Sequence, residues 1–170
     1  MIEYLDLARL HTPIYNEIQT AIDRVINNSW YILGEELELF EKEYADYCGT
    51  KYCIGVGNGL DALHIILLAC GIGAGDEVIV PTDTFVATAL AVSRCGATPV
   101  FADVDEDTYN LNAGSVEEKI TSKTKAVIAV HLYGRACSMK PVCEIAEQYS
   151  LKVIEDAAQA HGALIGDKRA

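Results

Sequence analysis

Three short segments carry residue types that could bind an anion or a planar ring. The turn GVGNGLDAL runs from an apolar stretch into a helical pattern, and its free backbone N–H groups and helix dipole would suit a phosphate. Phe85, among small residues in TDTFVATALAV, could stack on a flat ring. Asp156 ends the apolar run LKVIED, and close to the dipole of a following helix it would stay ionised and could face a cationic ring nitrogen.

Each of these residues also has a purely structural interpretation. Asn58 and Asp156 are common helix-cap types, and Phe85 taken alone is more typical of core packing. The dinucleotide-binding pattern GxGxxG is not matched, because Leu60 stands where the third glycine would fall. Asp156 could also be a magnesium ligand, as the acidic residue after a Walker B strand is. That interpretation is weakened because no GK[ST] follows the turn to make a P-loop. The histidines show no metal-binding spacing, so hydrogen-bonded or surface histidines are the simpler interpretation.

The elements that must position these residues alternate along the chain. Apolar runs at 52–56, 77–81, 98–104, 125–133 and 151–156 predict strands, and helical patterns begin near Asn58, Thr84, Ser115 and Ser138. Continuously apolar strands separated by helices predict an α/β fold, a mostly parallel, doubly wound sheet with helices on both faces. Ligands of such folds bind beyond the carboxyl ends of the strands, where Asn58, Asp156 and Gln159 are expected.

The first fifty residues predict helices instead of strands. Thr12 and Pro13 are typical of a helix start, and apolar residues then recur at helical spacing as far as Ile26. A second helix is expected from about Glu35 to Cys48, ended by Gly49. We therefore expect a helical segment over 1–50 and part of an α/β domain over 51–170, with no linker dividing the chain.

Charge and composition exclude several classes of function. The 170 residues include 25 acidic and 13 basic ones, for a net charge of -12, so the surface should repel nucleic acids and anionic membranes. No apolar run approaches the roughly 20 residues that span a bilayer. The N-terminus lacks the basic and apolar regions of a secretory signal, so we expect a cytoplasmic protein. Its six cysteines are then expected to be reduced and mostly buried.

The segments GNGLDAL, PTDTFVATA, VIAVHLYG and VIEDAAQAHGA, taken in order, resemble the DegT/DnrJ/EryC1/StrS family. These are pyridoxal-phosphate (PLP)-dependent sugar aminotransferases with the aspartate aminotransferase fold, and the resemblance runs from about Leu5 to the last residue. Many members carry SGT where this chain has GNG. The GNGLDAL version is similar to that of enzymes aminating C3 of dTDP-linked 3-keto deoxysugars, which implies deoxyaminosugar synthesis, as for cell-envelope polysaccharides.

The resemblance implies a role for each matching residue. Gly59 and Leu60, with Asn58 alongside, would hold the cofactor phosphate through backbone amides. Phe85 would stack on the pyridine ring, and Asp156 would pair with the protonated pyridine nitrogen, which keeps the ring an electron sink. Gln159 would hydrogen-bond the ring's 3-hydroxyl. Glutamate is the implied amino donor, a nucleotide-linked keto sugar the acceptor, and a homodimer the implied assembly.

One part of the family pattern is not found. Family members form a Schiff base with a lysine in a segment resembling S-F-x-x-x-K downstream of DAAQ, and no lysine here stands in such a segment. We therefore expect the catalytic lysine beyond Ala170, and the 170 residues to be an inactive N-terminal part of a longer enzyme that exposes apolar edges and self-associates. A sugar dehydratase of the same family, with histidine in place of lysine, and a non-catalytic cofactor-binding or interaction module are the alternatives.

Overall fold

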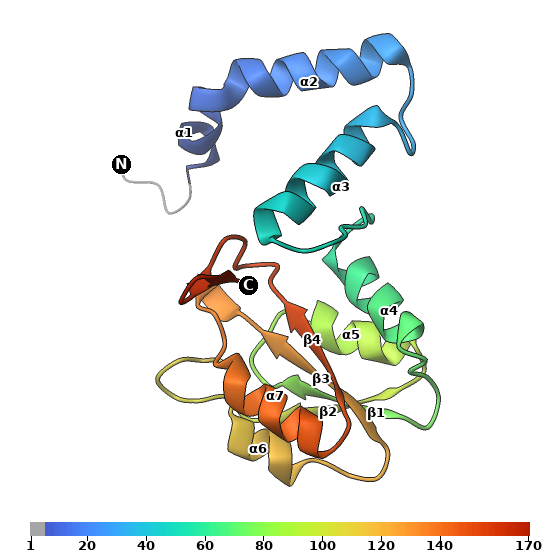
Figure 1. The fold of residues 1–170 in the computed structure, drawn as a ribbon, viewed down its shortest axis with the longest axis vertical. Helices are drawn as coiled ribbons and strands as arrows, with labels where there is room; N and C mark the ends of the chain where they lie inside the picture. Colours follow the sequence, from blue (N-terminus) through green and yellow to red (C-terminus); the bar gives the residue numbers. More distant parts are fainter. Residues whose placement is uncertain (1–5) are drawn as a thin grey trace. The chain divides into compact units, whose positions relative to one another are not determined.

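A computed structural model describes residues 6–170, which form two compact units, one ending at Gly55 and one running from Val56 to Ala170. The described part of the first unit is helical, with α1 (Leu7–His11), a 3-10 turn η1 (Thr12–Ile14), α2 (Tyr15–Asn28) and α3 (Glu35–Cys48) (Figure 1). The bounds expected for the second helix are confirmed. Gly49 ends it in the left-handed conformation with φ 71°, as its lack of a side chain allows.

The expected helix start at Thr12 is wrong. The Asp6 side chain instead caps α1 by accepting from the Arg9 amide at 2.9 Å. The Thr12 hydroxyl donates backwards to the Ala8 carbonyl at 2.7 Å, as helical threonines do, and Thr12 continues the helical turns that α1 has begun. Helical structure therefore begins at Leu7, before the proline.

The strand expected at 52–56 is absent from the described structure. Tyr52 and Ile54 are exposed, and the Gly55 amide donates to the Glu41 carboxylate at 2.7 Å instead of to a neighbouring strand. The segment is an irregular connection, because an apolar run forms a strand only where a sheet edge accepts it.

The second unit contains a parallel sheet of β1 (Glu77–Pro81), β2 (Thr98–Ala102), β3 (Thr124–Val130) and β4 (Lys152–Asp156) in the order β2-β1-β3-β4. These strands confirm four of the five expected ones. Residues 157–170 form turns and a small hairpin, β5 (Leu164–Ile165) with β6 (Lys168–Arg169), so no helix follows Asp156.

Helices cover both faces of the sheet, as expected (Figure 1). One core contains side chains of α4 (Gly59–Ala69) and α5 (Ala87–Arg94), and the other contains side chains of α6 (Ala113–Glu118) and α7 (Met139–Gln148). Val78 and Val80 point into the first core and Ile79 into the second, so successive residues of β1 are buried on opposite faces. Burial on both faces explains the unbroken apolar runs of the sequence.

Two further findings concern membrane-spanning helices and the cysteines. Among residues 6–170, no helix is long and apolar enough to cross a bilayer. All six cysteines are free thiols, but Cys137 alone is fully buried, so the expectation that most are buried is wrong.

Candidate functional site

The six residues expected to bind a ligand line one cavity of about 530 Å³ in the second unit. We call it the α4–α5 cavity, because the start of α4 and the segment leading into α5 form much of its wall. The chain reaches it at four places that are far apart in the sequence, and the parallel sheet brings them together. The expected residues are Asn58, Gly59, Leu60, Phe85, Asp156 and Gln159.

The start of α4 offers two backbone donors to the cavity. The Asn58 side chain accepts from the Asp61 amide at 2.9 Å, and the Asn58 carbonyl accepts from Ala62. Gly59 and Leu60 occupy the first two positions of the helix, whose amides have no intrahelical acceptor. Asn58 therefore caps the helix, and the same turn leaves the N–H groups of Gly59 and Leu60 free to bind a ligand.

A negative charge also stands at this turn. Asp61 accepts from the Asn58 side-chain amide at 2.9 Å, and its other carboxylate oxygen lies 3.6 Å from the Arg94 guanidinium. The positive charge of Arg94 partly neutralises this carboxylate. An anion at the Gly59 and Leu60 amides therefore meets less repulsion than the sequence alone indicates.

Phe85 presents its ring to the cavity from the segment before α5. Its side chain is 70% exposed although it lines the cavity, so the core-packing interpretation is wrong for this residue. An exposed aromatic ring at the wall of a cavity is a surface on which a second flat ring can stack.

The Asp156 carboxylate is held by partners that the sequence did not indicate. Its Oδ2 accepts from the Thr88 hydroxyl at 3.1 Å, and its Oδ1 accepts from the Ala158 amide at 3.2 Å. The helix dipole expected beside Asp156 is absent, since turns follow the strand; two hydrogen bonds fix the carboxylate instead. Thr88 in turn lies 2.9 Å from the Thr84 hydroxyl. In the sequence, Thr84 and Thr88 stand four residues apart in TDTFVATA, which is a weak indication of this contact.

The orientation of the Gln159 amide is set by the backbone of Tyr133. The Tyr133 N–H donates to Gln159 Oε1 at 2.8 Å, which leaves the Gln159 NH₂ group as the free donor. Tyr133 has a left-handed backbone with φ 55°, a conformation that a bulky residue adopts at a cost of about 1–3 kcal/mol. That strained turn supplies the N–H that fixes Gln159.

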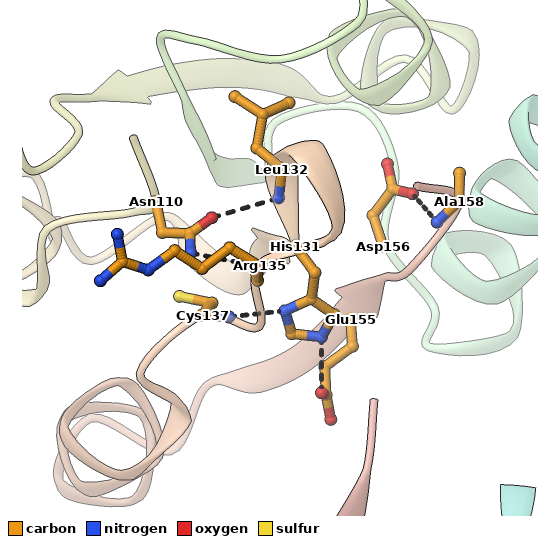
Figure 2. A network of polar contacts seen from close by, with 8 residues as sticks. All are labelled: Asn110, His131, Leu132, Arg135, Cys137, Glu155, Asp156 and Ala158. Atoms are coloured by element: carbon orange, nitrogen blue, oxygen red, sulfur yellow. Dashed lines mark hydrogen bonds and ion pairs between the residues drawn. The ribbon is translucent and has the colours of Figure 1, made fainter. Parts of the chain in front are cut away.

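A second polar network lies on the opposite face of β4 (Figure 2). The Cys137 amide donates to His131 Nδ1 at 2.9 Å, so the imidazole proton is on Nε2 and is donated to the Glu155 carboxylate, also at 2.9 Å. The Asn110 side chain joins the Leu132 amide to the Arg135 carbonyl. In the figure Glu155 turns toward His131, whereas Asp156 lies apart beside Ala158.

This network borders a larger cavity of about 780 Å³, which we call the α6–α7 cavity. His131 and Glu155 line it, and none of the six expected residues does. Burial raises the pKa of the neighbouring Cys137 thiol. Within residues 6–170 no group of histidine, cysteine and acidic side chains could hold a metal ion. His131 is thus a buried residue that joins β3 to β4.

The family model of the DegT/DnrJ/EryC1/StrS aminotransferases matches residues 13–170. The chain belongs to this family. It is 55% identical over 169 residues to a dTDP-3-amino-3,6-dideoxy-alpha-D-galactopyranose transaminase of Aneurinibacillus thermoaerophilus, covering 99% of this chain and 47% of the relative. It is 46% identical to a dTDP-3-amino-3,4,6-trideoxy-alpha-D-glucose transaminase of Streptomyces venezuelae, covering 99% of this chain and 44% of that one. The chain spans about half the length of the curated relatives it matches.

Solved structures of family members have the same fold. DesV of S. venezuelae, determined in complex with a ketimine intermediate, superposes with a TM-score of 0.97 at 46% identity over 99% of this chain and 46% of that chain. NtdA of Bacillus subtilis, with bound cofactor PMP, gives a TM-score of 0.89 at 38% identity over 94% of this chain and 37% of that chain. The expected sugar-aminotransferase family and its α/β fold are confirmed.

Proposed function

We propose that this chain supplies the cofactor-binding residues of a PLP-dependent aminotransferase that moves an amino group from glutamate to a keto sugar attached to a nucleotide. The observation that carries the proposal is the convergence of Gly59, Phe85, Asp156 and Gln159 on the α4–α5 cavity. A phosphorylated pyridine needs an anion site, a stacking surface, an anion for its ring nitrogen and a partner for its hydroxyl. The cavity offers all four.

The residues present fit pyridoxal phosphate, and each has a distinct task. The Gly59 and Leu60 amides would bind the phosphate at the start of α4, with Asn58 keeping that turn in shape. Phe85 would stack on the ring, and the free NH₂ group of Gln159 would donate to the 3-oxygen. Asp156 would hold the proton on the ring nitrogen. When bound, the cofactor supplies the electron sink that stabilises negative charge at the amino-bearing carbon.

The names of the relatives support a nucleotide-linked sugar as the acceptor. Two are transaminases named for dTDP-3-amino sugars, and two others act on UDP-linked sugars according to their names. We propose a 3-keto sugar linked to dTDP, since the two dTDP-sugar relatives include the match at 55% identity.

A homodimer in the cytoplasm is part of the proposal. Ile14, directly before α2, and the α2 residues Ile18, Ile22 and Ile26 are between 38% and 54% exposed, as residues that contact a second subunit would be in a single chain. The six free thiols are in keeping with a reducing compartment. The lysine implied by the family resemblance stays a prediction.

Titration of the chain with pyridoxamine 5′-phosphate tests the cofactor part of the proposal, since this form has no aldehyde to react with surface lysines. We expect saturable binding of one molecule per chain, followed by the fluorescence of the ligand. Pyridoxamine without the phosphate is the matched control and should bind much more weakly. Equal affinity for both ligands would contradict the assigned phosphate site.

The amino transfer itself is tested with ¹⁵N-glutamate and a dTDP-linked 3-keto-6-deoxyhexose, using the enzyme that contains this chain. Mass spectrometry should find the ¹⁵N label on the sugar. A sugar dehydratase is the second candidate, because a GDP-4-keto-6-deoxymannose-3-dehydratase superposes with a TM-score of 0.83 at 27% identity. Loss of a hydroxyl group without gain of label would favour that reaction.

A further inference from the structure

The hydroxyl group of Thr88 is completely buried and lies behind the α4–α5 cavity instead of in it. Its relative exposure is 0%, and it donates to Asp156 Oδ2 across 3.1 Å, from α5 to the end of β4. Asp156 lines the cavity while Thr88 does not. Thr88 therefore contacts the carboxylate from the protein side.

The direction of the proton in this contact follows from counting donors. A threonine hydroxyl has one proton, and Thr88 gives it to the carboxylate, which has none to give. In the contact between Thr84 and Thr88 at 2.9 Å, the Thr84 hydroxyl must then be the donor. Thr84 lines the cavity, so a chain of two hydrogen bonds leads from the cavity wall through Thr88 to Asp156.

Thr88 differs in this respect from two other hydroxyl residues on helices, Thr20 and Ser93. Thr20 donates to the Asn16 carbonyl and Ser93 to the Ala89 carbonyl, each four residues back along its own helix. Such back-bonding is the usual outcome for these residues in helices. Thr88 instead donates to a side chain 68 positions away, so its proton is committed to Asp156.

We propose that Thr88 is a positioning residue, which orients the Asp156 carboxylate toward the cavity, and that Thr84 fixes the direction of the Thr88 proton. The inference rests on the proposed function, in which Asp156 faces the ring nitrogen of the cofactor. With Oδ2 bound by Thr88 and Oδ1 by the Ala158 amide, rotation of the carboxylate breaks both hydrogen bonds. The remaining lone pairs are thereby held in place for the ring N–H before the ligand binds.

Two variants of one position test this inference. Thr88→Val keeps the shape of the side chain and removes the donor, whereas Thr88→Ser keeps the donor and removes a methyl group. Each is titrated with pyridoxamine 5′-phosphate and with its 1-deaza analogue, in which carbon replaces the ring nitrogen. We expect Thr88→Val to weaken binding of the first ligand about tenfold and to leave the second unchanged, and Thr88→Ser to stay within about twofold of the unchanged chain.

The results that would overturn the role of Thr88 differ from those that would overturn the proposed function. Equal weakening for both ligands, or the same loss in Thr88→Ser as in Thr88→Val, would show that Thr88 only packs the structure and would overturn the inference. Absence of binding by the unchanged chain would instead overturn the proposed function.

A measurement without ligand tests the hydrogen bond from Thr88 to Asp156 directly. A buried hydroxyl proton held by a carboxylate exchanges slowly with water and gives its own NMR signal. That signal should be present in the chain and lost in Asp156→Ala. A Thr88 hydroxyl proton that exchanges equally fast in both would overturn the inference.

Discussion

Thr88 and Asp156 lie 68 positions apart in the sequence, and a hydrogen bond of 3.1 Å joins their side chains. The bond links the start of α5 to the last residue of β4, so two segments of the cavity wall are fixed to each other. The cavity is thus a product of the sheet order β2-β1-β3-β4, in which the strand exits meet at one edge. Its binding properties should depend on single side chains that can be removed without unfolding the sheet.

Asp156→Asn removes the charge of the carboxylate and preserves its size. We expect the affinity for pyridoxamine 5′-phosphate to fall by about tenfold to a hundredfold, because a hydrogen bond to a charged group is lost. Isothermal titration measures the change. Asp103→Asn is the matched control, since Asp103 follows β2, is exposed and lies outside the lining of the cavity. Equal effects of the two substitutions would argue against a specific role for Asp156.

Phe85→Ala should separate binding from stability. The ring is 70% exposed, so its removal should change the free energy of unfolding by less than about 0.5 kcal/mol while weakening binding of the pyridine ring several-fold. Phe101→Ala, at an exposed ring of β2 outside the cavity, is expected to leave binding unchanged. Ligand titration and urea denaturation of both variants provide the measurements. Unchanged affinity in Phe85→Ala would rule out stacking on this ring.

Asn58→Ala removes the side chain that caps α4. The Asp61 amide then loses its acceptor, and we expect the free energy of unfolding to fall by about 1 kcal/mol, measured by urea denaturation. Phosphate binding at the neighbouring amides should weaken too, since the turn that presents them is less ordered. Asn58→Ser retains a capping oxygen and should recover most of the stability. Failure of serine to do better than alanine would disprove the capping argument.

The sequence predicted regular elements better than it predicted the surroundings of the site. The helix over Glu35–Cys48 and the strand Glu77–Pro81 were expected with the observed bounds, because periodicity and glycine placement are local signals. The prediction of a strand over 52–56 was wrong. The run YCIGV has the composition of a strand, but it pairs with no neighbouring strand, and Ile54 is exposed. Thr88 was missed, because nothing local marks a hydroxyl group whose acceptor is 68 positions away.

The apolar residues of α2 should control self-association. Ile18→Glu places a charge among them, and we expect it to shift the chain toward monomer in sedimentation velocity experiments. Asn16→Glu adds the same charge at an exposed position that is already polar and should not change the distribution. If Ile18→Glu sediments like the unchanged chain, these isoleucines have no part in the proposed homodimer.

Thiol labelling should follow burial. Cys70 and Cys143 are exposed and should react with iodoacetamide within minutes, whereas Cys137 should stay unmodified in the folded chain. Burial raises its pKa, so at pH 8 to 9 less thiolate is present than at an exposed cysteine, and the reagent also lacks access. Peptide mapping by mass spectrometry reads out each site, with labelling in urea as the reference. Early modification of Cys137 would mean that this face opens readily.

Glu155 and Asp156 point to opposite faces of β4, which limits the insertions and deletions that this strand can accept. A deletion or insertion of one codon within β4 would exchange the two faces of the strand after that point. An insertion before Glu155 would place this glutamate near Thr88 and leave His131 without its acidic partner, whereas a deletion there would place Asp156 opposite His131 and Ala157 near Thr88, although both acidic residues were retained. Natural variation in length should therefore be confined to the connections between elements, while β4 tolerates only exchanges of one residue for another.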